Sequence, residues 1–176
     1  EQTYTIYARS PAETWGASPA TGSGETGVQA TTKAAPGQAP VVTGIAVTDT
    51  TVTLPHNAAW EYSTDQQTWN STHEFTGLTP ATAYTYYVRV KGTDTTMESQ
   101  TAAVTVYTAY SAPAAGTGYT IHFDTETLTI DSGLEVNTAE DFTGAEIASG
   151  GSLAGCTGQT LYIRRAAGGS GVPASG

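Results

Sequence analysis

Short runs of alternating apolar and polar residues recur along this chain and predict β-strands. From Tyr84 to Lys91, Tyr or Val stands at every second position, and Thr, Tyr, Arg and Lys fill the positions between them. A period of two places one set of side chains on each face of a strand. The runs from Ile45 to Leu54 and from Ile121 to Ile130 each predict two short strands around a polar turn. The pattern therefore predicts an all-β fold.

The same pattern returns after about 75 residues. "YVRV" at residues 87–90 reappears as "YIRR" at 162–165 and, more weakly, as "YARS" at 7–10. Upstream, "GIAVTDTTVTL" aligns with "TIHFDTETLTI", and "WEYST" with "LEVNT". Because repeat arrays stack similar units, we expect three modules. These are residues 1–38, the C-terminal strands of a truncated module; 39–113, a complete module of seven strands; and 114–176, a divergent module without its last strand.

The stretch "LTPATAYTYYVRV" resembles the signature of fibronectin type III domains, in which a Leu-x-Pro-x-Thr-x-Tyr turn leads into an alternating strand. Together with "WEYSTDQQTW" and "FTGLTP", it is similar to the fibronectin-III-like repeats of large bacterial cell-surface and secreted proteins. The resemblance implies tandem immunoglobulin-like β-sandwich modules. It also implies a tyrosine corner, in which the Tyr84 hydroxyl bonds to backbone near Leu78, just before Pro80.

The third expected module departs from this signature. Gly155 stands where the middle module has Pro80, and Gln159 stands in place of Tyr84. We therefore expect a less firmly held corner there. The incomplete outer modules have two explanations: the chain is a cut from a longer array, or strands of a neighbouring molecule complete the modules by strand donation.

Five aromatic residues are candidates for structural or binding roles. Trp60 and Tyr62 alternate with polar residues, so we expect both in the core, because a strand buries every second side chain. Trp69, Tyr87 and Trp15 are candidate partner contacts, because exposed aromatic residues on a sheet stack against sugar rings or anchor proteins. Cross-strand packing that protects the sheet is the alternative, and it is the one we favour for these residues.

Composition narrows the function classes. Six Lys plus Arg against sixteen Asp plus Glu give a net charge of -10, which disfavours nucleic acid and anionic membrane surfaces as partners. No apolar run reaches the roughly 18 residues of a membrane span, so we expect no membrane insertion. The single Cys156 excludes an internal disulfide. His56, His73 and His122 are scattered without metal-ligand spacing, and no catalytic grouping is evident, so we expect no metal, no cofactor and no enzyme.

Two functions remain open from the sequence. The first is a structural spacer, or stalk, of an extracellular bacterial surface or secreted protein, which presents an adhesive or catalytic domain and has neighbouring repeats as its partners. The second is an adhesin-type module that binds host glycan or host protein through exposed aromatic residues and loops.

Overall fold

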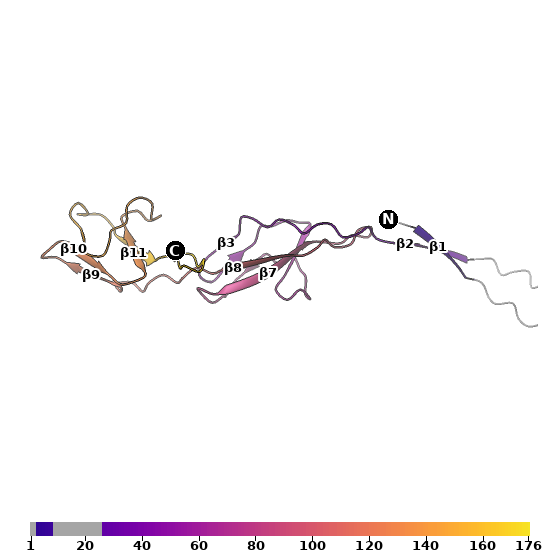
Figure 1. The fold of residues 1–176 in the computed structure, drawn as a ribbon, viewed down its shortest axis with the longest axis horizontal. Helices are drawn as coiled ribbons and strands as arrows, with labels where there is room; N and C mark the ends of the chain where they lie inside the picture. Colours follow the sequence, from indigo (N-terminus) through magenta and orange to yellow (C-terminus); the bar gives the residue numbers. More distant parts are fainter. Residues whose placement is uncertain (1–2, 9–25) are drawn as a thin grey trace, which may run out of the picture.

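The computed structural model describes residues 3–8 and 26–176, and this part of the chain contains strands and loops but no helix. All strand pairings between named strands are antiparallel. The described part of the chain is elongated (Figure 1). Strands β1 (Thr3–Ala8) and β2 (Thr26–Thr31) lie at one end, and β9 (Tyr119–His122) and β10 (Thr127–Ile130) lie at the other. The C-terminus lies between a middle part and a C-terminal part, the two larger parts of the structure. The predicted all-β class is confirmed.

A two-stranded hairpin begins the described chain. β1 (Thr3–Ala8) pairs with β2 (Thr26–Thr31). The segment after β2 binds alongside the loop that follows β7 in the middle of the chain. There the Ala34 N–H donates to the carbonyl oxygen of Thr95 over 2.7 Å, and the Ala34 carbonyl accepts from the Met97 N–H over 3.1 Å. The linker to the middle part is therefore held by backbone hydrogen bonds.

The middle part consists of two three-stranded sheets. One sheet has the order β3-β4-β6, with bounds Ala46–Val47, Val52–Thr53 and Glu74–Phe75. The other has the order β5-β7-β8, with bounds Trp60–Ser63, Ala83–Val90 and Ala102–Tyr107. Side chains of both sheets meet in one core, an arrangement consistent with a β-sandwich.

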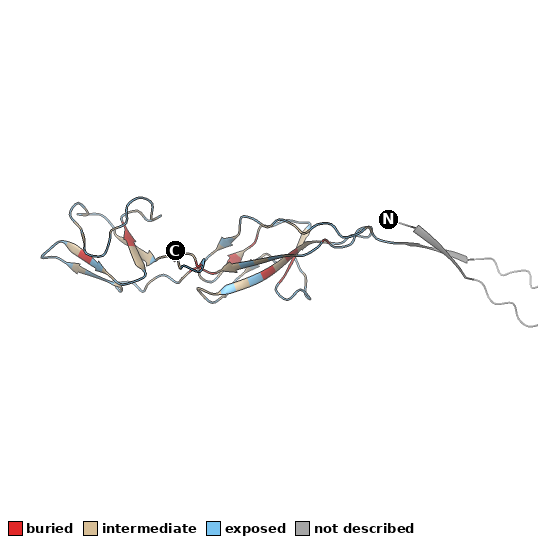
Figure 2. Ribbon diagram, viewed as in Figure 1, coloured by how far each residue is buried: buried red, intermediate tan, exposed pale blue. Residues whose placement is uncertain are grey.

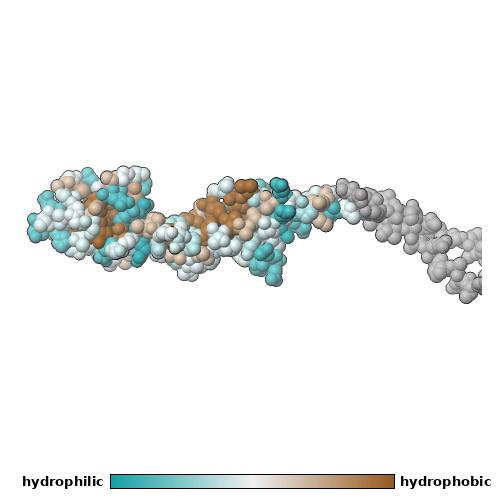
Figure 3. All heavy atoms as spheres, in the orientation of Figure 1, coloured by the Kyte–Doolittle hydropathy of each residue, from teal (hydrophilic) through white to brown (hydrophobic). Residues whose placement is uncertain are grey.

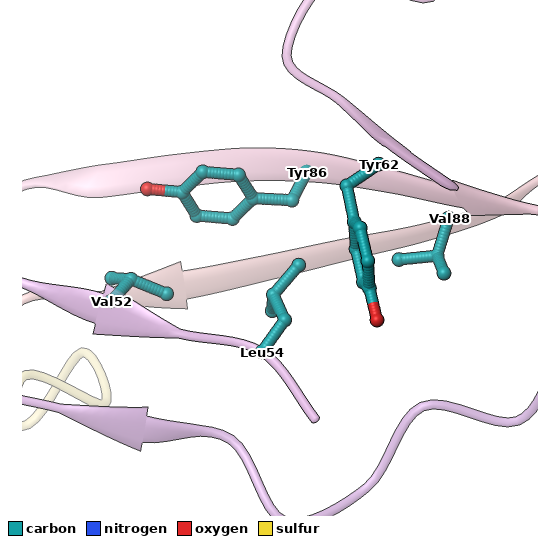
Figure 4. Close-up of a cluster of buried hydrophobic side chains, with 5 residues drawn as sticks. All are labelled: Val52, Leu54, Tyr62, Tyr86 and Val88. Carbon is teal, nitrogen blue, oxygen red and sulfur yellow. The ribbon is translucent and has the colours of Figure 1, made fainter. Parts of the chain in front are cut away.

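The core of the middle part is small and well buried (Figure 2, Figure 4). Its members are each at most 2% exposed: Val52, Leu54, Tyr62, Tyr86 and Val88. Full burial of one large apolar side chain stabilises a fold by about 1.5–3 kcal/mol. Trp60 and Tyr84 pack against this core and are half-buried, whereas Tyr62 lies within it. Trp60 is the first residue of β5, where the sheet ends and solvent reaches the ring.

The two buried tyrosines differ in their hydroxyl groups. The Tyr62 hydroxyl donates to the Pro55 carbonyl over 2.6 Å and accepts from the Asn57 N–H over 3.2 Å. The Tyr86 hydroxyl has no hydrogen-bond partner in the described part of the chain. Burial, and secondarily the charge of Tyr84, raises the pKa of Tyr86 to about 12.

The middle part has six strands and not the expected seven. The segment "TWNS" contributes a single bridge, in which Asn70 and Tyr62 exchange two backbone hydrogen bonds of 2.8 and 3.1 Å. The Asn70 side chain then accepts from the Thr72 N–H, which forms a turn directly after the bridge. This turn ends the pairing before a strand can form.

The C-terminal part also consists of two antiparallel sheets. One sheet has the order β12-β10-β9, with bounds Gly151–Ser152, Thr127–Ile130 and Tyr119–His122. The other pairs β11 (Leu134–Asn137) with β13 (Tyr162–Arg165). Leu128 and Val136 are the buried apolar strand residues of this part, one from each sheet. Apolar surface also gathers on both larger parts (Figure 3).

The linker between these two parts is bound on both sides. The Ala109 N–H donates to the Thr48 carbonyl over 2.9 Å, and the Tyr110 N–H donates to the Pro173 carbonyl over 3.2 Å. The Tyr110 ring lies so close to Gly168 that a Cβ there would be 2.9 Å from the Tyr110 hydroxyl. A side chain at residue 168 would therefore displace the Tyr110 hydroxyl.

Candidate functional site

Trp69, one of the expected partner contacts, lies in a stack on the outer side of the sheet β5-β7-β8. The Arg89 guanidinium carbon is 4.0 Å from the Trp69 ring centroid, within cation–π range. Arg89 Nε also donates to Glu61 Oε1 over 2.6 Å. Trp69 is half-buried, and its Nε1–H donates to the Gln66 carbonyl over 3.1 Å. One ring face and the ring nitrogen are thus engaged within the chain.

Strand register and one capped turn build this stack. Glu61 lies directly opposite Arg89 in the β5–β7 pair, so their side chains share one face of the sheet. The turn after β5 is fixed by Asp65, whose Oδ1 accepts from the Thr68 N–H, the Gln67 N–H and the Ser63 hydroxyl at 2.7, 2.8 and 2.9 Å. These bonds, led by that of Thr68, lower the pKa of Asp65 to about 2. Trp69 follows this turn, which places its ring against the Arg89 guanidinium.

The C-terminal part carries a second stack of the same composition. Glu135 lies opposite Arg164 in the β11–β13 pair, and Arg164 Nε donates to Glu135 Oε1. The Arg164 guanidinium carbon is 3.9 Å from the ring centroid of Phe142. A hydrogen bond from the protonated Glu146 carboxyl to Glu135, followed by the charge of Glu135, raises the pKa of Glu146 beside this pair. The alignment of the two repeats matches Glu61 with Glu135 and Arg89 with Arg164. This repeated Glu and Arg pattern was the sequence signal from which both ion pairs could have been predicted.

The chemistry of both stacks is that of a cross-strand clamp. Each guanidinium bridges a carboxylate on the neighbouring strand and an aromatic ring from the loop after that strand. The four charged side chains are 13–27% exposed, so the pairs are partly shielded from water. Neither stack presents a bare aromatic platform, since an arginine covers one face of each ring.

The other candidate contacts do not join Trp69. Tyr87 is half-buried and lies opposite Ser63 on one side and Ala103 on the other. No ring contact links Tyr87 with Trp69 in the residues that the structure describes. Trp15 lies outside the described residues.

The residues expected to form a corner lie together. The Tyr84 hydroxyl accepts a hydrogen bond from the Thr79 N–H over 2.9 Å, next to Leu78. The Leu78 N–H donates to the Thr50 carbonyl over 2.9 Å, and the Pro80 carbonyl accepts from the Thr82 hydroxyl over 2.9 Å. At the corresponding place in the C-terminal part, the Gln159 side-chain amide donates to the Gly155 carbonyl over a longer 3.3 Å.

Two of the histidines, which are scattered in the sequence, are neighbours in the fold. The ring centroids of His56 and His73 are 4.8 Å apart. They meet because the Leu54 N–H donates to the His73 carbonyl, which continues the β4–β6 pairing toward His56. His122 lies apart on β9 and bonds to Thr129. Within the described ranges, no group of three or more His, Cys, Asp or Glu is placed to hold a metal ion.

The free cysteine, the search for membrane-spanning helices and the comparisons with known proteins do not assign a function to the chain. Cys156 is a free, half-buried thiol. Among the residues with described placement, no helix is long and apolar enough to cross a membrane. Comparison of the chain with known protein families, with curated proteins and with solved structures gives no match.

Proposed function

We propose that this chain is a tandem array of fibronectin type III-like β-sandwich modules that serves as a spacer in an extracellular bacterial surface or secreted protein. The proposed module boundaries lie near residues 38 and 113. The observation that carries the proposal is the bound linker between the two larger parts. A spacer has to hold successive modules at a fixed angle, and a linker whose backbone bonds to both neighbours does this.

Repeated contacts support the tandem arrangement. The Val90 N–H donates to the Ser99 hydroxyl over 2.8 Å, and the Ser99 N–H donates back to the Val90 carbonyl over 3.1 Å. Arg165 and Ser175 make the same two bonds at 2.9 and 3.1 Å. With the two Glu–Arg–aromatic stacks, these contacts indicate one structural unit used twice.

A binding function through Trp69 and Tyr87 has weaker support. Stacking of a sugar requires an open aromatic face. Arg89 occupies one face of Trp69, and Tyr87 is flanked by strands on both sides. The elongated form and the bound linker favour the spacer instead (Figure 1).

Residual dipolar couplings measured on the full chain test the spacer proposal. If the linker fixes the two parts, the amides of residues 39–113 and 114–176 report one common alignment tensor. The Tyr110→Pro variant removes the N–H that bonds to Pro173, so the two tensors should diverge. Ala112→Pro is the matched control, because the Ala112 N–H donates no backbone hydrogen bond in the described part. Unequal tensors in the unmodified chain would refute a rigid spacer.

A further inference from the structure

The two β-strands that carry the stacked arginines, β7 and β13, differ in how many partner strands they have. β7 is paired on both edges, with β5 on one side and β8 on the other. β13 pairs with β11 only, and no other strand of the described chain lies on its second edge. An unpaired strand edge offers a row of backbone donors and acceptors to another strand.

The backbone groups on this open edge can be identified. Arg165 directs its N–H and its carbonyl away from β11, because both bond to Ser175. In a strand, alternate residues point their backbone groups to the same edge. The N–H and carbonyl of Ile163 therefore also face away from β11.

In the middle part, the corresponding strand edge, that of β7, is occupied by β8. Val88 corresponds to Ile163 by the shared Glu–Arg register, and Val88 lies opposite Ala102 of β8. On β8, the half-buried Ala102, Val104 and Val106 alternate with the exposed Ala103 and Thr105. Val106 also packs against the core.

From these observations we infer that the free edge of β13 is an acceptor site for an antiparallel strand with the alternating pattern of β8. The occupant is an extended segment with small or β-branched apolar residues at every second position and Thr or Ala between them. It would form bonds with the Ile163 backbone and cover the core around Val136, which lies opposite Ile163. This inference goes beyond the spacer function and does not depend on it.

The position of Ser175 supports this occupant. Ser99, which makes the same two bonds in the middle part, stands three residues before β8 begins at Ala102. A strand that follows Ser175 with the same spacing would therefore reach the edge of β13 beside Ile163. Both serines are buried, at 9% and 2% exposure, so the approach to the edge is fixed in both parts.

A full chain extended after Gly176 by the sequence of residues 101–110 tests the site. Hydrogen exchange of the Ile163 amide, followed by NMR, should slow at least about tenfold relative to the unextended chain. A control extension carries Pro at the places of Ala102 and Val104, the positions opposite Ile163 and its next neighbour along this edge, and should give no slowing, because Pro cannot donate to the ladder. The Arg164 amide, which faces β11, should be protected in all three chains.

A synthetic peptide of residues 101–108, added to the unextended chain, provides a second measurement that does not depend on folding of the extension. It should shift the Ile163 amide signal, and its Pro-substituted form should not. Equal Ile163 exchange in the two extended chains, together with no peptide effect, overturns the proposal. Concentration-dependent protection of Ile163 in the unextended chain also overturns it, in favour of a second copy as the occupant.

Discussion

The Tyr84 hydroxyl is a single polar atom that joins the start of β7 to the loop before it. It accepts from the Thr79 N–H, while the ring packs against the core beside Leu78. Replacing Tyr84 by Phe keeps the ring and removes this acceptor. The free energy of unfolding should fall by about 1 kcal/mol, the usual net contribution of one hydrogen bond.

Urea denaturation of the Tyr84→Phe variant checks this value. Tyr87→Phe is the matched control. Tyr87 lies on the same strand as Tyr84, and its hydroxyl makes no hydrogen bond to another described residue. Equal unfolding midpoints for the Tyr84→Phe variant and the unmodified chain would show that the hydroxyl has no stabilising role.

Backbone N–H groups of the turn after β5 stabilise the charged form of Asp65. Its pKa is lowered to about 2 from 3.8, first by the hydrogen bond from the Thr68 N–H and then by that from Gln67. A lowered folded-state pKa means that the stabilisation is complete above pH 3.8. It is then lost as the pH falls from about 3.8 toward 2.

NMR titration of the Asp65 carboxyl carbon measures this pKa directly. The Ser63→Ala variant removes one of the three donors to Oδ1, so its Asp65 should titrate at a higher pH than in the unmodified chain. A midpoint near 3.8 in the unmodified chain would contradict the capped turn.

At the scale of elements, the Glu61–Arg89–Trp69 stack ties β5, β7 and the turn between β5 and Trp69 together. Arg89→Lys keeps the charge but loses the planar group that covers the indole. The expected loss of stability is about 0.5–1 kcal/mol, as for a partly exposed cation–π contact and ion pair. The indole N–H signal of Trp69 should also shift, because its ring would lose its cover.

The molecule supplies its own control for this experiment. Arg164→Lys makes the same change in the C-terminal part, where the covered ring is Phe142. It should leave the Trp69 signal in place. If Arg89→Lys leaves both the stability and the Trp69 signal unchanged, the stack does not clamp the sheet.

The sequence predicted the strands more completely than it predicted the contacts of the candidate site. Alternation located β7 almost to the residue, since Tyr86 and Val88 must face the core while Thr85 and Arg89 face outward. It did not predict that Arg89 covers Trp69, because this contact depends on the Asp65 turn, which brings the ring over a strand twenty residues away in sequence. The alternation also predicted a hairpin strand that continues past Asn70, whereas the structure has a single bridge there. An alternating pattern does not show where the turn formed by the Asn70 side chain ends the pairing.

At the scale of the whole molecule, the two larger parts differ in how much they bury. In the middle part, five large hydrophobic side chains are at most 2% exposed, whereas in the C-terminal part the hydrophobic side chains of Leu128 and Val136 reach that level and Val172 is 7% exposed. Buried apolar area is the main source of stability, so the C-terminal part should unfold first. We expect two transitions in urea and not one, because the two cores share no buried cluster.

Residue-specific NMR signals followed through a urea series separate the two transitions. Signals of Val136 and Ile163 should disappear at a lower urea concentration than those of Val52 and Val88. The Leu128→Ala variant should lower the first midpoint and leave the second in place, because Leu128 lies in the C-terminal core. Val52→Ala, a truncation at the matching buried position of the other core, should lower the second. Coincident loss of all four signals would mean that the bound linker around Tyr110 couples the two parts into one cooperative unit.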